Sequence, residues 1–288
     1  MKKRIPLALQ AAAGLALGLG LCIYLVRQTA LTGDDRRQLL ENINIQALIG
    51  VVALTFLMLW TGARKWAFLD RALDHHAPHA TGYYWRHFVW QSWLAQILPS
   101  TVALIAGRAL ATHGGGERNW KRGFKNAMVD QLGELFIVMA FMPGSLLQLW
   151  MDISFPAWLI CGLGVAVLGG AAGVKIFPRL VFPEALMWSF LRILFMTLRL
   201  LLGAMAFNLA LAPAHIAYAL PFATLTVLVP LTPGNLGLAE WGWVFSLMLW
   251  GDAKGVAALY ALSFRVLILI MQTLALPLAF MFPKSRAG

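Results

Sequence analysis

Charged residues are scarce in this chain of 288 residues, where Asp, Glu, Lys and Arg together make up 12% of the sequence. A typical soluble domain carries about 25%, so both an ordinary soluble enzyme and a disordered chain are excluded. Acidic residues are the scarcer kind, with 12 Asp and Glu against 23 Lys and Arg. The only two cysteines, Cys22 and Cys161, lie inside apolar runs, which excludes a disulfide scaffold.

Apolar residues are abundant instead: 60% of the chain is hydrophobic, and its mean hydropathy is +0.73. Apolar runs recur from end to end, and most have the length of about 20 residues that a membrane-spanning helix requires. We therefore predict an all-α polytopic membrane protein in which residues 1–288 form a single integral membrane domain. The runs are 5–26, 44–62, 87–111, 126–149, 157–176, 190–212, 216–250 and 255–282.

Two of these runs are interrupted, 87–111 at Pro99 and 216–250 over residues 230–235. Proline and glycine end a helix, and broken backbone at membrane depth is tolerated only beside protein or a water-filled cavity. We predict that each broken run is a re-entrant helical hairpin. With a cytoplasmic N-terminus, this topology places 17 Lys and Arg inside and 4 outside, whereas a full crossing by 87–111 gives 8 inside and 13 outside.

The hairpin topology divides the chain into two similar halves, a first repeat over 1–149 and a second over 157–282. Each half is expected to contain two helices, a re-entrant hairpin and a further helix, and to cross three times. The second half is then inverted relative to the first, which is an architecture of transporters. Both termini are predicted on the cytoplasmic side of a bacterial-type inner membrane, and the excess of positive charge marks that side without implying a nucleic-acid partner.

A few ionisable residues fall inside apolar runs, where charge is costly and marks a candidate functional site. Asp130 and Glu134 lie one helical turn apart, Glu240 follows the second break, and Arg265 lies in the last run. We expect Asp130 to face Arg265 across the interface between the repeats. A buried ion pair that only fixes helix packing is the alternative. Arg199 is expected to reach toward the cytoplasmic interface, because its run begins near residue 190.

The second break contains Gly234, Asn235 and Gly237. A half-helix that starts here has backbone N–H groups without intrahelical partners, and these groups favour an anion such as phosphate. The two glycines permit a close approach to the backbone. The alternative is a tight turn whose N–H groups bond to water or to Asn235.

The segment with Pro233, Gly234, Gly237, Glu240 and Arg265 resembles the transmembrane (flippase) domain of lysylphosphatidylglycerol synthase/flippase proteins. Positions of the first half are also similar, namely Pro99, Arg108, Asp130 and Glu134. The family has Gly and Glu after the first proline, where this chain has Ser100, Ala103 and Leu104. The chain is expected to be a stand-alone relative without the aminoacyltransferase domain. The resemblance then implies translocation of a phospholipid or of a polyprenyl-phosphate-linked or hopanoid-linked lipid.

We therefore predict a lipid flippase that moves an anionic lipid between leaflets through a site between the two hairpins. Phosphate is expected on Arg265 and the second turn, whereas the carboxylates bind an amine or take up a proton. A non-transporting scaffold for a lipid or glycan biosynthetic enzyme is the alternative. Motifs for a nucleophile, a metal or a nucleotide are missing from the sequence, so we expect no catalytic residue, metal or cofactor. The candidate substrate-binding residues are Arg108, Asp130, Glu134, Gly234, Asn235, Gly237, Glu240 and Arg265.

Overall fold

The computed structural model describes residues 7–28, 43–74, 81–98, 100–111, 117–176, 183–227 and 232–281. These residues form helices joined by short connections, and no strand occurs among them. Five of the described helical segments are long and apolar enough to cross a membrane. The chain is an all-α membrane protein, as its composition predicts.

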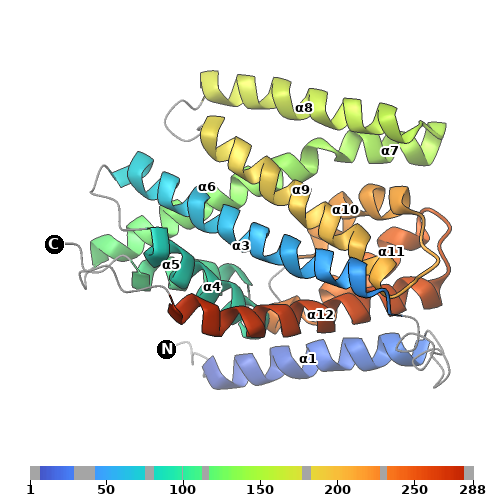
Figure 1. Cartoon of the computed structure of the whole chain (residues 1–288), viewed down its shortest axis with the longest axis horizontal. Coiled ribbons are helices and arrows are strands. Elements are labelled where there is room, and N and C mark those ends of the chain that lie inside the picture. Colours follow the sequence, from blue (N-terminus) through green and yellow to red (C-terminus); the bar gives the residue numbers. More distant parts are fainter. Residues whose placement is uncertain are drawn as a thin grey trace, which may run out of the picture.

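The elements follow in chain order and carry the labels of Figure 1. They are α1 (Leu7–Gln28), α3 (Ile45–Asp74), α4 (Thr81–Ile97), α5 (Ser100–Ala111), α6 (Glu117–Ala140), α7 (Met142–Met151), α8 (Phe155–Ile176), α9 (Pro183–Ala206), α10 (Pro213–Val227), the short 3-10 helix η1 (Pro233–Asn235), α11 (Leu238–Met248) and α12 (Lys254–Met281).

Three helices differ from their predicted bounds in ways that affect the site. The predicted run 44–62 is only the first part of α3, which continues to Asp74 and therefore includes the polar residues that follow the run. The run 190–212 is displaced toward the N-terminus, because Pro183 begins α9 and a left-handed Asn208 follows its end. The run 126–149 divides at Phe141 into α6 and α7, where a proline enters the first turn of α7.

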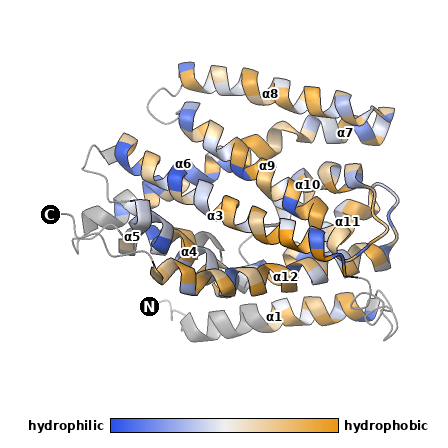
Figure 2. Cartoon of the chain, in the orientation of Figure 1, coloured by the Kyte–Doolittle hydropathy of each residue, from blue (hydrophilic) through white to orange (hydrophobic). Residues whose placement is uncertain are grey.

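Helices α1, α8 and α12 run along the longest axis of the molecule, whereas α3 and α9 lie obliquely to it and pack against each other (Figure 1). The α7–α8 pair lies on one side of α3 and α9, and α1 and α12 lie on the other. The outer helix α8 is apolar along most of its length (Figure 2), and its Val167 and Leu168 are 68% and 73% exposed. Large apolar side chains directed away from the protein are expected where the surroundings are lipid.

The helices on either side of each break pack against each other, α4 on α5 and α10 on α11. In Figure 1 the first pair lies toward the left-hand end of the molecule and the second pair toward the right. Their turns meet, because the Gly234 N–H donates to the Leu98 carbonyl at 3.0 Å. Pro99 itself and residues 228–231 lie outside the described residues.

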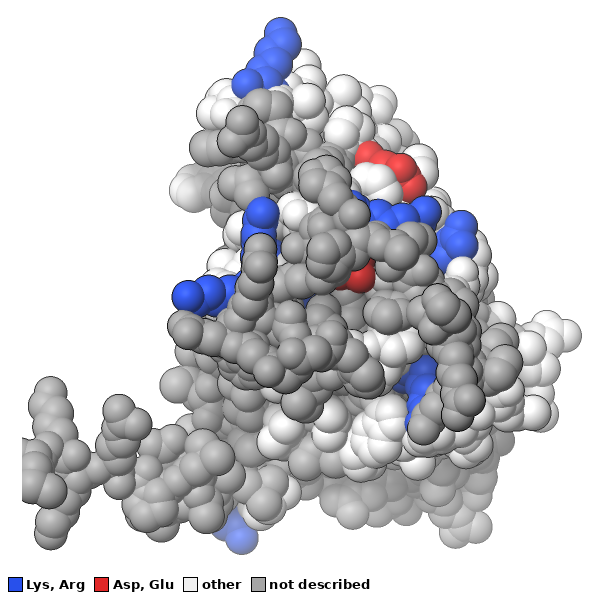
Figure 3. Space-filling view, turned by 90° about the vertical axis from the view of Figure 1, so that its left-hand side faces the viewer, with Lys and Arg blue, Asp and Glu red and all other residues white. Residues whose placement is uncertain are grey.

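One end of the molecule carries much positive charge. Helix α1 begins and α12 ends at the left-hand end of Figure 1. Seen from that end, the blue Lys and Arg side chains predominate over the red Asp and Glu (Figure 3). Arg71 lies in the last turn of α3 and Lys175 in the last turn of α8.

Candidate functional site

Apart from Asp70, which accepts a hydrogen bond from Tyr84, the buried Asp, Glu, Lys and Arg side chains of the described residues fall into two groups, each completed by partly buried partners. The first, called the Asp130 cluster, joins α3, α5, α6 and α9. Its members are Lys65, Arg108, Asp130, Glu134 and Arg192. The second, called the Glu240 cluster, joins α9, α11 and α12. Its members are Arg199, Glu240 and Arg265.

Asp130 lies at the centre of the first cluster, with its side chain 1% exposed. Lys65 Nζ lies 2.5 Å from Asp130 Oδ1 and also donates to the Asp130 carbonyl at 2.8 Å. Arg108 pairs with the other carboxylate oxygen, Oδ2. Each oxygen of this carboxylate therefore has its own cation, which is the arrangement that a buried charge requires.

The remaining members extend the Asp130 cluster to neighbouring helices. Arg108 donates to the Asn126 carbonyl at 3.0 Å and to Asn126 Oδ1 at 2.6 Å. Glu134 pairs with Arg192 of α9, and its Oε1 lies 3.4 Å from Lys65 Nζ. Both predicted carboxylates of the first half are thus engaged by cations of the protein.

The prediction that Asp130 faces Arg265 is wrong. Asp130 pairs with Lys65 and Arg108, whereas Arg265 pairs with Glu240. The prediction failed because the run 44–62 seemed to end before Lys65, which placed this cation in a loop. In the structure α3 continues past Lys65 and buries it beside α6.

Glu240 lies in the first turn of α11 and is 2% exposed. Its Oε2 accepts the Gly237 N–H at 2.6 Å, and its Oε1 lies 3.4 Å from Arg265 Nε. Arg265 Nη2 also donates to the Gly234 carbonyl at 2.6 Å. The carboxylate therefore caps its own helix and links the turn before α11 to α12.

The turn between α10 and α11 owes its shape to left-handed backbone. Gly234, Asn235 and Gly237 have φ values of 58°, 54° and 80°, a region that glycine and, less readily, asparagine adopt. A side chain at Gly234 would collide with the Gln96 carbonyl of the first turn. These residues allow two turns to approach each other closely.

The N–H groups of the turn have acceptors within the protein. Gly234 donates to the Leu98 carbonyl and Asn235 to the Thr232 carbonyl, each at 3.0 Å, while Gly237 donates to Glu240. The expectation that these three groups stand ready for an anion is wrong for this conformation. The alternative prediction, a tight turn whose N–H groups are already bonded, agrees with this conformation. The acceptors are the Leu98 and Thr232 carbonyls and the Glu240 carboxylate, and not the Asn235 side chain.

The predicted position of the Arg199 side chain, at the cytoplasmic interface, is wrong. Arg199 lies well inside α9 and is 7% exposed, so it does not extend to the interface. Its guanidinium carbon lies 5.4 Å from the centre of the Phe264 ring. Within the described part of the chain no carboxylate pairs with it, and its buried Nε has no hydrogen-bond partner. A helix start at Pro183 was the signal that would have predicted its burial.

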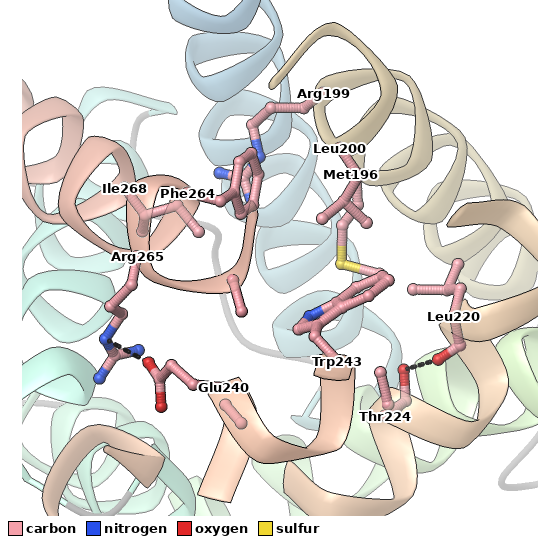
Figure 4. A pocket seen from close by; sticks show the side chains of 13 residues that line it. Met196, Arg199, Leu200, Leu220, Thr224, Glu240, Trp243, Phe264, Arg265 and Ile268 are labelled. Carbon is pink, nitrogen blue, oxygen red and sulfur yellow. Dashed lines mark hydrogen bonds and ion pairs between the residues drawn. The ribbon is translucent and has the colours of Figure 1, made fainter. Parts of the chain in front are cut away.

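The Glu240 cluster lines a cavity of about 160 Å³ among α9, α10, α11 and α12. Figure 4 shows Arg199 beside Phe264, with Arg265 and Glu240 joined on the neighbouring wall. The other lining side chains are mostly apolar, and Trp243 of α11 extends toward Met196, on the side of the cavity away from Arg265. Two cations face one anion here, so the cavity has an uncompensated positive charge.

Comparison with protein-family models finds none that matches the chain, and comparison with curated proteins finds no match either. Within the described residues, His, Cys, Asp and Glu side chains form no group of three that could hold a metal ion. The side chains that line the cavity offer electrostatic attraction and hydrogen bonding by arginine, with a carboxylate and aromatic rings beside the arginines.

Proposed function

We propose that this protein is a lipid translocase, which moves an anionic, phosphate-bearing lipid between the leaflets of a bacterial-type cytoplasmic membrane. The observation that carries the proposal is the charged cavity of the Glu240 cluster inside a largely apolar helix bundle. Charge at such a place is costly and marks a path for polar or charged groups. A headgroup that crosses between leaflets needs such a path.

The proposal includes a membrane topology. The pairs α4–α5 and α10–α11 are re-entrant hairpins that enter from opposite sides and meet at their turns, as the hydrogen bond between Gly234 and Leu98 favours. Residues 1–149 and 157–282 are inverted repeats, and both termini face the cytoplasm. Binding sites of inverted-repeat transporters lie near the midplane where broken helices meet, and this is the level at which the two turns touch.

The ion pairs of the two halves support the repeat. In the first half, Arg108 of α5 pairs with Asp130 of α6. In the second, Glu240 of α11 pairs with Arg265 of α12. Each pair joins the second helix of a broken pair to the helix that follows, with the positions of acid and base exchanged. The resemblance of this segment to the lysylphosphatidylglycerol flippase domain points to the same class of cargo, a phospholipid or a polyprenyl-phosphate-linked lipid.

A leaflet-exchange assay tests the proposal. The full chain is reconstituted into liposomes with fluorescent phosphatidylglycerol, and a reductant that cannot cross the membrane reports how much label reaches the outer leaflet. We expect the wild type to exchange the lipid faster than protein-free liposomes. Arg265→Ala is expected to lower the rate, because it removes a cavity cation and its bond to the turn.

The matched control is Lys175→Ala, which removes an exposed cation from the end of α8. This variant should exchange lipid like the wild type. If the wild type, Arg265→Ala and protein-free liposomes all exchange lipid at one slow rate, the translocase proposal is overturned and the scaffold alternative takes its place.

A further inference from the structure

We infer that Arg199 is the anion-binding residue of the cavity and that it holds the phosphodiester group of the lipid. The inference rests on the proposed function and deepens it, because it assigns the headgroup to a residue outside the broken helices. It also moves the phosphate away from the second turn, where the sequence had indicated it.

The first argument is the burial of Arg199 without a counter-charge. Its side chain is 7% exposed and no carboxylate of the described residues pairs with it. A buried charge is normally paired, because removing it from water is costly. The Phe264 ring, 5.4 Å from the guanidinium carbon, offsets part of this cost. The remainder calls for an anion that the described residues do not supply.

The second argument is that the other lining cation, Arg265, and the nearby turn already have partners within the protein. Arg265 contacts Glu240 and the Gly234 carbonyl. The N–H groups of Gly234 and Gly237 donate to the Leu98 carbonyl and to Glu240. Arg199 is the lining cation that no protein oxygen engages in the described part of the chain.

The third argument concerns the size and charge of the ligand. A cavity of about 160 Å³ has room for a phosphate-sized group. Two arginines and one glutamate leave one positive charge, which a phosphodiester with a single negative charge neutralises. The planar fork of an arginine matches two oxygens of such a group.

Binding by the purified full chain in detergent tests the inference. The probes are dihexanoyl phosphatidylglycerol, dihexanoylglycerol without a phosphate, and inorganic phosphate, each titrated by calorimetry. We expect the wild type to bind phosphatidylglycerol and not dihexanoylglycerol. Arg199→Gln should weaken the binding about 10- to 100-fold, the worth of a charged hydrogen bond. Arg199→Lys, which keeps the charge and loses the fork, should be intermediate.

The matched control is Arg192→Gln, two turns earlier on α9, whose guanidinium is engaged by Glu134. It should bind phosphatidylglycerol like the wild type. If saturating inorganic phosphate competes with the lipid for the wild type, this result also supports the anion site at Arg199. Free phosphate is then a second source of the ligand. Phosphatidylglycerol binding that is equal in the wild type and Arg199→Gln, or binding of dihexanoylglycerol that is as tight, overturns the inference.

The result is separable from the test of translocation. Binding that depends on Arg199 in a protein that exchanges no lipid keeps the site and removes the translocase. Exchange that Arg199→Gln leaves intact, together with unchanged binding, keeps the translocase and removes this site. Should Arg199→Gln fail to fold, Arg199→Lys answers the same question through its loss of the bidentate contact.

Discussion

The two clusters of buried charge are built from similar parts. In each half of the chain a cation lies on the long helix before the broken pair, Lys65 on α3 and Arg199 on α9. In each half an ion pair also joins the second helix of the broken pair to the next helix. The similarity makes the one difference informative, because it concerns the cation on the long helix.

Each cluster has one cation more than it has carboxylates, but in the Asp130 cluster every cation contacts a carboxylate, and Lys65 lies 2.5 Å from Asp130 Oδ1. In the Glu240 cluster Arg199 lines a cavity, and the one carboxylate of the cluster, Glu240, is engaged by Arg265 and the Gly237 N–H. The first cluster joins helices through its ion pairs, whereas the second is the one for which we propose an external anion. Substitutions in the two clusters should therefore differ in size and even in sign.

The largest effect is expected from Asp130→Asn. The substitution keeps the shape of the side chain but leaves Arg108 buried without a counter-charge and Lys65 with Glu134 alone, at 3.4 Å. Breaking one partner of a buried pair costs about 3–5 kcal/mol, so we expect a much lower thermal midpoint in detergent and a poor yield of folded protein. An unchanged midpoint would show that the first cluster contributes nothing to the packing of α3, α5 and α6.

A smaller loss of thermal stability is expected from Gly234→Ala. The added methyl group would meet the Gln96 carbonyl, and the residue has a positive φ. Gly251→Ala is the matched control, because its φ is 83° but the space around it is open. The left-handed backbone alone costs about 1–2 kcal/mol with a side chain. We expect Gly251→Ala to show this cost and Gly234→Ala to exceed it in thermal unfolding. Equal losses would mean that the contact between the two turns is not tight in solution.

Arg192→Gln should have a modest effect of about 1 kcal/mol or less. Its side chain is 18% exposed, so water screens part of its interaction with Glu134. Lys65 Nζ also remains 3.4 Å from the Glu134 carboxylate after the change. Thermal midpoints of Arg192→Gln and Asp130→Asn, measured side by side, compare the contribution of the Arg192–Glu134 pair with that of Asp130. A loss as large as that of Asp130→Asn would contradict the assignment of Asp130 as the centre of the cluster.

The smallest change, and one of opposite sign, is expected from Arg199→Met in the absence of added lipid. The substitution removes a buried charge without a carboxylate partner and leaves no acid uncompensated, so the free energy of unfolding should stay equal or rise. Thermal unfolding with and without dihexanoyl phosphatidylglycerol checks this, because added lipid should stabilise the wild type alone. A marked loss of stability without lipid would instead make Arg199 a packing residue.

The sequence predicted the helical membrane character, the positions of both breaks and the burial of Asp130 and Glu240, because each of these follows from local composition. It did not predict their partners. Pairing depends on where helices end and cross, and the polar residues that extend α3 to Asp74 hid Lys65 from a search for apolar runs. Arg199 was misplaced for the same reason, since residues 183–189 are less apolar than the rest of α9.

The conformation of the second turn was also beyond the sequence. Gly234, Asn235 and Gly237 fit an anion-binding helix start and a tight turn equally well. Two contacts stabilise the tight turn. The Glu240 carboxylate accepts the Gly237 N–H, and the Leu98 carbonyl, in the other half of the chain, accepts the Gly234 N–H. Contacts between residues more than a hundred positions apart leave no local pattern in a single sequence.

The central claim is that a lipid headgroup passes through the cavity of the Glu240 cluster. The measurement that tests it most directly is the rate of phosphatidylglycerol exchange in proteoliposomes for the wild type and for Ala239→Phe. This substitution fills the cavity from α11 and leaves every charge in place. We predict exchange by the wild type and its loss in Ala239→Phe at a similar thermal midpoint. Exchange that continues undiminished through the filled cavity would contradict the claim.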